Sequence, residues 1–120
     1  GSEMCIRDRN NLANAQLKLK DPTALQTAQA AHKIAPQNPL VIDTLGWVLF
    51  QQGQTEQALP LLRDARLRAP GNPEIRYHLA KVLFATGRKA EARDEAREAL
   101  KISDRFDGAA DAQALASGQP

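Results

Sequence analysis

The sequence is short of the residue types that build most catalytic and metal sites. It contains one cysteine, which excludes an internal disulfide. Its two histidines, His32 and His78, have no second cysteine or clustered carboxylate at metal-ligand spacing. GxxxxGK, GxSxG and HExxH motifs are all missing. We therefore predict no enzymatic activity, no metal site and no cofactor within these residues, and no redox role for Cys5.

Strong charge of one sign and long apolar runs are also absent. Sixteen basic residues are interleaved with fourteen acidic ones, and the net charge is only +2. The sequence therefore does not imply a strong positive electrostatic field that would attract nucleic acid or anionic lipid. No apolar run approaches 18 residues, so we expect no direct membrane insertion by this segment. Aromatic residues make up 4% of the chain, so its core must be built from Leu, Val, Ile and Ala.

What the sequence does contain is a pattern that returns every 34 residues. Residues 39–72 and 73–106 align without a gap, and nine aligned positions are identical. A fixed period of this length is typical of stacked helical hairpins, which mostly serve as binding surfaces. The identical pairs are Pro39/Pro73, Leu45/Leu79, Val48/Val82, Leu49/Leu83, Phe50/Phe84, Gly53/Gly87, Ala58/Ala92, Arg63/Arg97 and Ala65/Ala99.

Each copy carries start and stop signals for two helices. Within residues 40–52 the apolar side chains recur at helical spacing, after an Asn-Pro pair that can cap and open a helix. Gly53 and Gly87 end the first helix of each copy, where a left-handed turn residue is needed. Second helices are predicted near 56–68 and 89–102, with small alanines that allow close helix packing.

These signals predict an all-α protein, an α-solenoid of about three antiparallel helix hairpins with a C-terminal capping helix. A more divergent first copy is assigned to 10–38, the second to 39–72 and the third to 73–106. A capping helix is expected over 107–116 and a frayed tail over 117–120. Residues 1–9 do not fit the repeat and are assigned to a non-native or disordered leader. This segment resembles a translated sequencing-adaptor read, and a Gly-Ser cloning scar is an alternative for its first two residues.

The repeated positions resemble the tetratricopeptide repeat (TPR) family over residues 10–106. That family is marked by a large apolar residue, Leu-Gly, Leu or an aromatic residue, Gly, Ala, a large residue, Ala and Pro. The third copy departs from this pattern at its last position, where Asp104 replaces Pro. The second copy matches with Ile42, Leu45, Gly46, Leu49, Gly53, Ala58, Leu62, Ala65 and Pro70.

The resemblance implies that first helices line a concave face that binds a protein or peptide. Trp47 and Tyr77 are large and rigid with polar tips, so they are either partner anchors or fillers between hairpins. Phe50 and Phe84 are expected to pack between repeats. Around the anchors, a mixed-polarity ligand would be oriented by polar side chains. The predicted partner-binding residues are Asn10, Asn14, Asp43, Trp47, Tyr77 and Lys81.

Two other binding modes are disfavoured. Some relatives grip a C-terminal carboxylate, but of the matching positions only Asn14 fits, and Glu74 would repel the ligand. The remaining matching positions are Asn10, Thr44 and His78. Arg63, Arg66 and Arg68 form a basic cluster on one second helix, but it is interrupted by Asp64 and has no aromatics beside it, so we interpret it as a solvated face.

A finer resemblance concerns the wider source of the chain. The order NNLA, KDP, APQNPLVIDTLGWVLFQQG, APGNPEIRYHLA and GRKAEAR is similar to bacterial repeat lipoproteins associated with exosortase and exopolysaccharide gene clusters. That resemblance implies a larger bacterial scaffold at the periplasm or outer membrane; without it, the cytoplasm is expected. Two alternatives to a peptide-binding module remain: the targeting arm of a larger enzyme such as a glycosyltransferase, and a ligand-free structural spacer.

Overall fold

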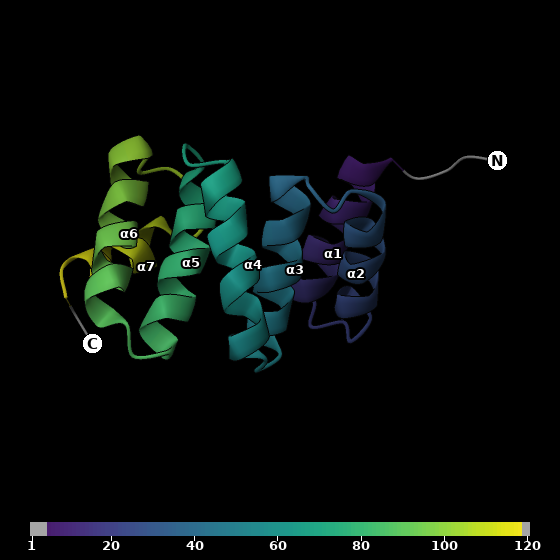
Figure 1. Cartoon of the computed structure of the whole chain (residues 1–120), viewed down its shortest axis with the longest axis horizontal. Helices are drawn as coiled ribbons and strands as arrows, with labels where there is room; N and C mark the ends of the chain where they lie inside the picture. The colour runs from purple at the N-terminus through teal and green to yellow at the C-terminus, as the bar shows by residue number, and fades with distance from the viewer. Residues whose placement is uncertain (1–4, 119–120) are drawn as a thin grey trace.

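The computed structural model describes residues 5–118 as a row of helices along one long axis, with overall dimensions of 49 × 26 × 23 Å (Figure 1). Consecutive helices pack as antiparallel hairpins, α1 with α2, α3 with α4 and α5 with α6, and α7 packs on α6. This arrangement confirms the predicted all-α solenoid. The helices are α1 (Ile6–Lys18), α2 (Ala24–Ile34), α3 (Pro39–Gln51), α4 (Thr55–Arg68), α5 (Pro73–Ala85), α6 (Lys89–Ile102) and α7 (Ala109–Ala116).

The first helices of the second and third hairpins begin with the same cap. The side-chain oxygen of Asn38 accepts a hydrogen bond from the backbone N–H of Leu40 at 3.0 Å. Asn72 accepts one from the N–H of Ile75 at 3.1 Å. In both cases proline occupies the first helical position, where a backbone donor is not required.

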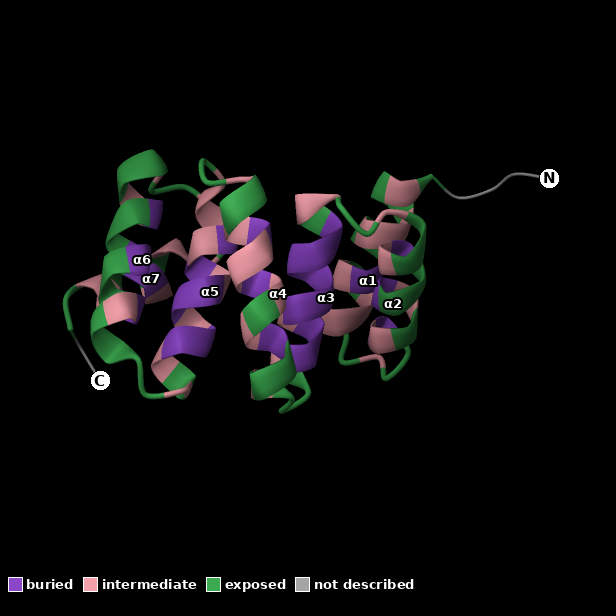
Figure 2. Ribbon diagram, viewed as in Figure 1, coloured by how far each residue is buried: buried purple, intermediate pink, exposed green. Residues whose placement is uncertain are grey.

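The core runs through the whole stack and consists of aliphatic side chains on the sides of helices that face each other. In Figure 2, α3 and α5 are largely buried, while α2 and α6 turn exposed residues outward. Gly46 shows how closely one hairpin is packed, because a Cβ added there would lie 2.9 Å from Cγ of Leu62. Small residues also occupy the same site in the flanking hairpins, where Ala13 and Ala80 are fully buried.

Part of the segment assigned to the leader, residues 1–9, is helical. Helix α1 begins at Ile6, and the Sγ atom of Cys5 accepts a hydrogen bond from the N–H of Asp8 at 3.4 Å. Residues 6–9 are therefore the first turn of a helix. The rest of the assigned leader, residues 1–4, lies outside the described part of the chain, as do residues 119–120 of the assigned tail.

Candidate functional site

A hollow of about 330 Å³ lies on the face formed by the first helices α1, α3 and α5. The three helices follow one another along the stack, so side chains from all three converge there. The volume is at the lower end of the range for ligand pockets and suits one or two side chains of a partner. The lining residues are Asn10, Asn11, Asn14, Leu17, Lys18, Leu40, Asp43, Thr44, Trp47, Glu74, His78 and Asp107.

One wall of the hollow is held together by asparagine and threonine. Nδ2 of Asn14 donates to Oγ1 of Thr44 at 3.2 Å and to the carbonyl oxygen of Asn10 at 3.1 Å. The Thr44 hydroxyl donates in turn to the carbonyl oxygen of Leu40 at 2.9 Å. The link joins α1 to α3, so Asn14 stabilises the stack as well as lining the hollow. Oδ1 of Asn10 is buried without a hydrogen-bond partner.

The floor of the hollow is a contact between Asp43, His78 and Trp47. Oδ1 of Asp43 lies 2.8 Å from Nδ1 of His78 on the next first helix, and only 7% of Asp43 is exposed. Because an ionised carboxylate can only accept, Nδ1 of His78 is the donor. The His78 ring stacks on Trp47 with centroids 4.0 Å apart and an interplanar angle of 17°. Trp47 is half-buried, and the stack fixes its position at the edge of the hollow.

The rim carries three further charged groups. Nζ of Lys18, at the end of α1, pairs with Oδ2 of Asp107 at 3.7 Å, although both side chains are about three-quarters exposed. Glu74, in the first turn of α5, is half-buried and has no hydrogen bond or ion pair with any residue of the described chain.

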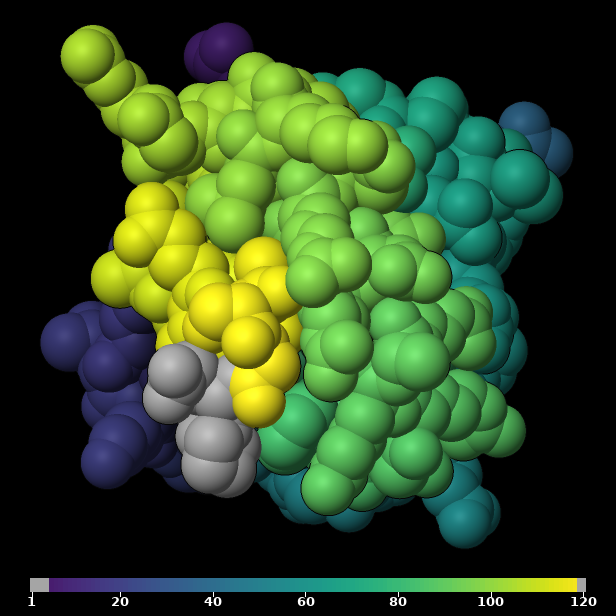
Figure 3. Space-filling view, turned by 90° about the vertical axis from the view of Figure 1, so that its left-hand side faces the viewer, coloured from purple at the N-terminus to yellow at the C-terminus, as the bar shows by residue number. Residues whose placement is uncertain are grey.

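The next part of the same face is occupied by the chain itself. The Tyr77 hydroxyl donates to Oδ2 of Asp111 in α7 at 2.7 Å, and Nζ of Lys81 pairs with the same oxygen at 2.8 Å. The Tyr77 ring also lies beside Phe106, with centroids 6.1 Å apart. Figure 3 shows α7, in yellow, lying against the light-green surface of α6 at the C-terminal end.

The contact between Tyr77 and Asp111 shifts the pKa values of both side chains. Burial, together with the hydrogen bond to Asp111 and its negative charge, holds the pKa of Tyr77 far above its usual value. Burial also disfavours the charged form of Asp111, but the hydrogen bonds from Lys81 and Tyr77 outweigh it, and the pKa of Asp111 lies below its ordinary value. Tyr77 is thus neutral and Asp111 ionised at neutral pH.

Four of the six predicted site residues, Asn10, Asn14, Asp43 and Trp47, line the hollow. Tyr77 does not, and the expectation that it faces an open groove is corrected: only 7% of it is exposed, because α7 covers its ring. Lys81 likewise points to Asp111 rather than to the hollow. Phe50 and Phe84 pack against the core that joins the hairpins.

Thr44, Glu74 and His78 are not among the residues that the sequence predicts to bind a partner. The structure places all three in the hollow, together with Lys18 and Asp107, which no motif had indicated. The signal that could have revealed the Asp43–His78 contact is their spacing of 35 residues, one repeat plus one position, on neighbouring first helices.

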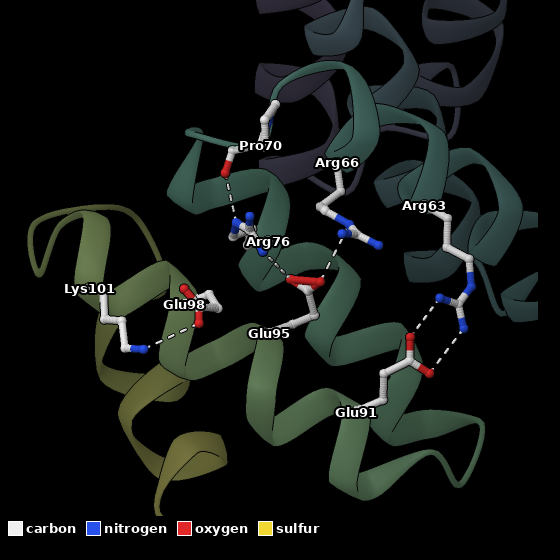
Figure 4. A network of polar contacts seen from close by, with 8 residues as sticks. All are labelled: Arg63, Arg66, Pro70, Arg76, Glu91, Glu95, Glu98 and Lys101. Atoms are coloured by element: carbon white, nitrogen blue, oxygen red, sulfur yellow. Dashed lines mark hydrogen bonds and ion pairs between the residues drawn. The ribbon is translucent and has the colours of Figure 1, made fainter.

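The outer face offers no free basic surface at the arginine cluster. Figure 4 shows Arg63 making two hydrogen bonds to Glu91, at 2.6 and 3.1 Å, and Arg66 approaching Glu95 at 3.4 Å. Glu95 also pairs with Arg76 at 2.9 Å. The hydrogen bonds from Arg63 hold the pKa of Glu91 below its usual value despite partial burial. Arg63 and Arg66 connect α4 of one hairpin to α6 of the next, whereas Arg76 on α5 pairs with Glu95 within its own hairpin.

Within residues 5–118, no group of three or more His, Cys, Asp or Glu side chains is arranged to hold a metal ion. None of the helices in this range is both long and apolar enough to cross a membrane.

Stacked antiparallel hairpins of 34-residue period define a helical-repeat protein. The sequence pattern of the tetratricopeptide repeat family matches residues 49–117, more than half of the chain. The chain therefore belongs to the tetratricopeptide repeat family.

Known proteins resemble parts or all of the chain. A TPR repeat-containing protein of Pseudomonas aeruginosa is 41% identical over 49 residues, which are 41% of this chain and 8% of that protein. The O-GlcNAc transferase of Thermobaculum terrenum is 26% identical with a TM-score of 0.79, over 87% of this chain and 20% of that chain. The chain thus spans only a small fraction of the length of these two relatives.

A second likeness concerns the fold alone. PcrH from Pseudomonas aeruginosa covers 98% of this chain with a TM-score of 0.79 and 20% identity, over 93% of its own length. The type III secretion translocator chaperone SycD of Yersinia enterocolitica covers 97% of this chain, with a TM-score of 0.77 and 18% identity, over 83% of its own length.

Proposed function

We propose that this chain is a protein-interaction module that holds a peptide or extended segment of its partner in the hollow between α1, α3 and α5. The observation that carries this proposal is the contrast along one face. The α7 helix covers Tyr77, whereas Trp47, Leu40 and Glu74 border a hollow that no described segment fills. Membership in the TPR family supports a protein partner.

The arrangement of the hollow supports the binding of partner side chains. Its polar wall is braced by the Asn14–Thr44 hydrogen bond and its floor by the Asp43–His78 contact. A braced wall needs little rearrangement on binding, so less of the interaction free energy is spent on ordering side chains. Leu40, which is 49% exposed, and Trp47 supply the apolar contact area at the rim.

A selection of random dodecapeptides displayed on phage tests this proposal. The purified chain is compared with Leu40→Arg, which fills the hollow from an exposed position. The matched control is Leu67→Arg, which makes the same change at a 73% exposed leucine on α4. We expect peptides that bind the parent and Leu67→Arg but not Leu40→Arg. Peptides that bind all three equally, or no enriched peptides, would contradict a binding groove.

A second candidate function is the targeting arm of a larger enzyme. It is favoured by the match to the O-GlcNAc transferase, of which the chain covers 20% at 26% identity. In that case the hollow would bind a substrate protein for a catalytic domain elsewhere in the same polypeptide. The complete coding sequence that contains this chain tests the idea. A glycosyltransferase domain in it would support the arm, and further repeats alone would support a scaffold.

A further inference from the structure

The charged groups around the hollow are not balanced. Three carboxylates line it, those of Asp43, Glu74 and Asp107, against the single ammonium group of Lys18. Lys18 pairs with Asp107, and Asp43 pairs with His78. The Glu74 carboxylate is left without a partner in the described chain, at the edge of a half-enclosed space.

Two polar groups of the hollow, Asn14 and His78, have donors that are already engaged within the protein. Asn14 uses its Nδ2 donor group in bonds to Thr44 and Asn10, so its remaining capacity is the acceptor Oδ1. Nδ1 of His78 is held by Asp43 and is likewise unavailable to a ligand. These two groups therefore offer no free donor to a ligand carboxylate, whereas Glu74 and Oδ1 of Asn14 can accept from a ligand donor.

The apolar part of the hollow suits the stem of a long basic side chain. Leu17, Leu40 and Trp47 contribute aliphatic and aromatic surface beside Glu74. Lysine and arginine place their methylene groups on apolar surface while the charged end reaches a polar partner. Arg105 lines a neighbouring hollow that shares Glu74, but it lies 4.0 Å from Asp104 as an ion pair and is 93% exposed. It therefore leaves Glu74 available.

We propose that the hollow selects a lysine or arginine side chain of the partner segment. Glu74 forms the ion pair with its charged end, and Leu40 and Trp47 contact its stem. The inference rests on the proposed function and names the chemistry of its ligand. It assigns to this groove a preference opposite in sign to a carboxylate grip, because Glu74 supplies a negative charge where such a grip requires a positive one.

The test uses the peptides enriched in the dodecapeptide selection. Trp47 is the only tryptophan in the chain, so its fluorescence reports binding at the hollow directly. Each enriched peptide is titrated against the parent and against Glu74→Gln, with every lysine or arginine of the peptide replaced by glutamine in turn. Glu56→Gln is the matched control, because Glu56 also lies in the first turn of a helix but is exposed on α4.

We expect lysine or arginine to be enriched in the selected peptides. One replacement in the peptide should weaken binding about tenfold, the size of a charge-assisted hydrogen bond. Glu74→Gln should cause a similar loss, and the two changes together should cost no more than either alone, which identifies a direct pair. Glu56→Gln should leave the dissociation constant unchanged.

Three results would overturn the inference. Peptides that fail to bind Leu40→Arg but show no enrichment of lysine or arginine would support the proposed function and contradict a basic ligand. Independent, additive effects of Glu74→Gln and the peptide replacement would show that the basic residue binds elsewhere. Enrichment of acidic peptides, or of none, would also contradict it, and in the last case the proposed function fails as well.

Discussion

The two halves of the first-helix face have similar architecture but different surroundings. Around Trp47 the face is a hollow bordered by α1, α3 and α5, and Glu74 has no partner there among the described residues. Around Tyr77 the corresponding surface is covered by α7, and both Tyr77 and Lys81 bind Asp111. An aromatic residue on a first helix is therefore accessible to a partner only where no further helix of the chain lies over it.

The difference also separates two kinds of residue. Side chains in the covered half contribute to stability, because their polar groups are satisfied inside the protein. Glu74 in the half that α7 does not cover is half-buried and has no hydrogen bond or ion pair within the described chain. The Asn14 and Asp43 side chains combine both properties, since each bonds to a residue on a neighbouring helix and also lines the hollow.

The largest expected effect comes from disturbing the packing on Tyr77, in the half of the face that α7 covers. Gly108 has φ of +99°, and a Cβ added there would overlap the Tyr77 ring. Gly108→Ala should therefore combine left-handed strain with overpacking, and lower the free energy of unfolding by about 3 kcal/mol. Urea unfolding followed by circular dichroism measures it.

Gly53→Ala is the control for this prediction. Gly53 has φ of +85°, but nothing lies within 4 Å of an added Cβ. Only the backbone strain applies, so we expect a loss of about 1 kcal/mol. Equal losses in the two variants would show that α7 does not pack on Tyr77 as described.

The next largest effect is a fall in the free energy of unfolding at alkaline pH, caused by ionisation of Tyr77. The folded pKa of Tyr77 is raised by burial and by Asp111, so its contribution is complete below the usual tyrosine pKa of about 10 and is lost as pH rises above it. Stability should fall by up to about 1.4 kcal/mol for each pH unit in that range. Because Tyr77 is the only tyrosine, tyrosinate absorbance should appear together with unfolding.

Tyr77→Phe separates this titration from other alkaline effects. The variant loses the hydrogen bond to Asp111 and should be about 1 kcal/mol less stable at neutral pH. Its stability should then depend less on pH above 10 than that of the parent. If the stability of Tyr77→Phe fell with pH above 10 as steeply as that of the parent, the Tyr77 titration would not be the cause.

A smaller effect is expected on the acid side. The folded pKa of Asp111 is lowered, so its contribution is present above the usual aspartate pKa of about 4 and is lost as pH falls through the folded value. Since the Asp111 side chain is 42% exposed, solvent screening limits the contribution to below about 1 kcal/mol. Asp111→Asn should flatten the acid limb of the pH–stability curve by that amount.

The smallest effect is expected in the open half. Glu74 has no partner in the described chain, so Glu74→Gln should change the free energy of unfolding by no more than about 0.5 kcal/mol. Thermal and urea unfolding of the variant measure this change. A loss above about 1 kcal/mol would show that Glu74 is a structural residue and not a free ligand-binding group.

The repeat period predicted the fold because each local signal agreed with it. The Asn-Pro caps, the glycines after the first helices and the buried alanines all appear where hairpins require them. The same period placed Trp47 and Tyr77 on the first-helix face. It did not predict that Tyr77 is buried, because that depends on how α7 docks, and α7 is too short to carry a repeat pattern of its own.

The charged residues show a second limit of sequence analysis. Arg63, Arg66 and Arg68 cluster in sequence, but Arg63 and Arg66 have partners on α6, at Glu91 and Glu95. The Asp43–His78 contact joins α3 to α5 in the same way. Such pairs depend on the rotation of one hairpin against the next, which composition and spacing do not specify.

The most direct test of the account is a backbone NMR titration of the chain with a peptide from the dodecapeptide selection. If the peptide binds in the hollow and α7 stays on Tyr77, chemical shifts should change in α1, near Leu40 and Trp47, and around Glu74 and His78. The amides of α7 and of Phe106 should stay unchanged. Changes concentrated in α7 would show instead that the peptide displaces this helix, and would contradict the assignment of the two halves.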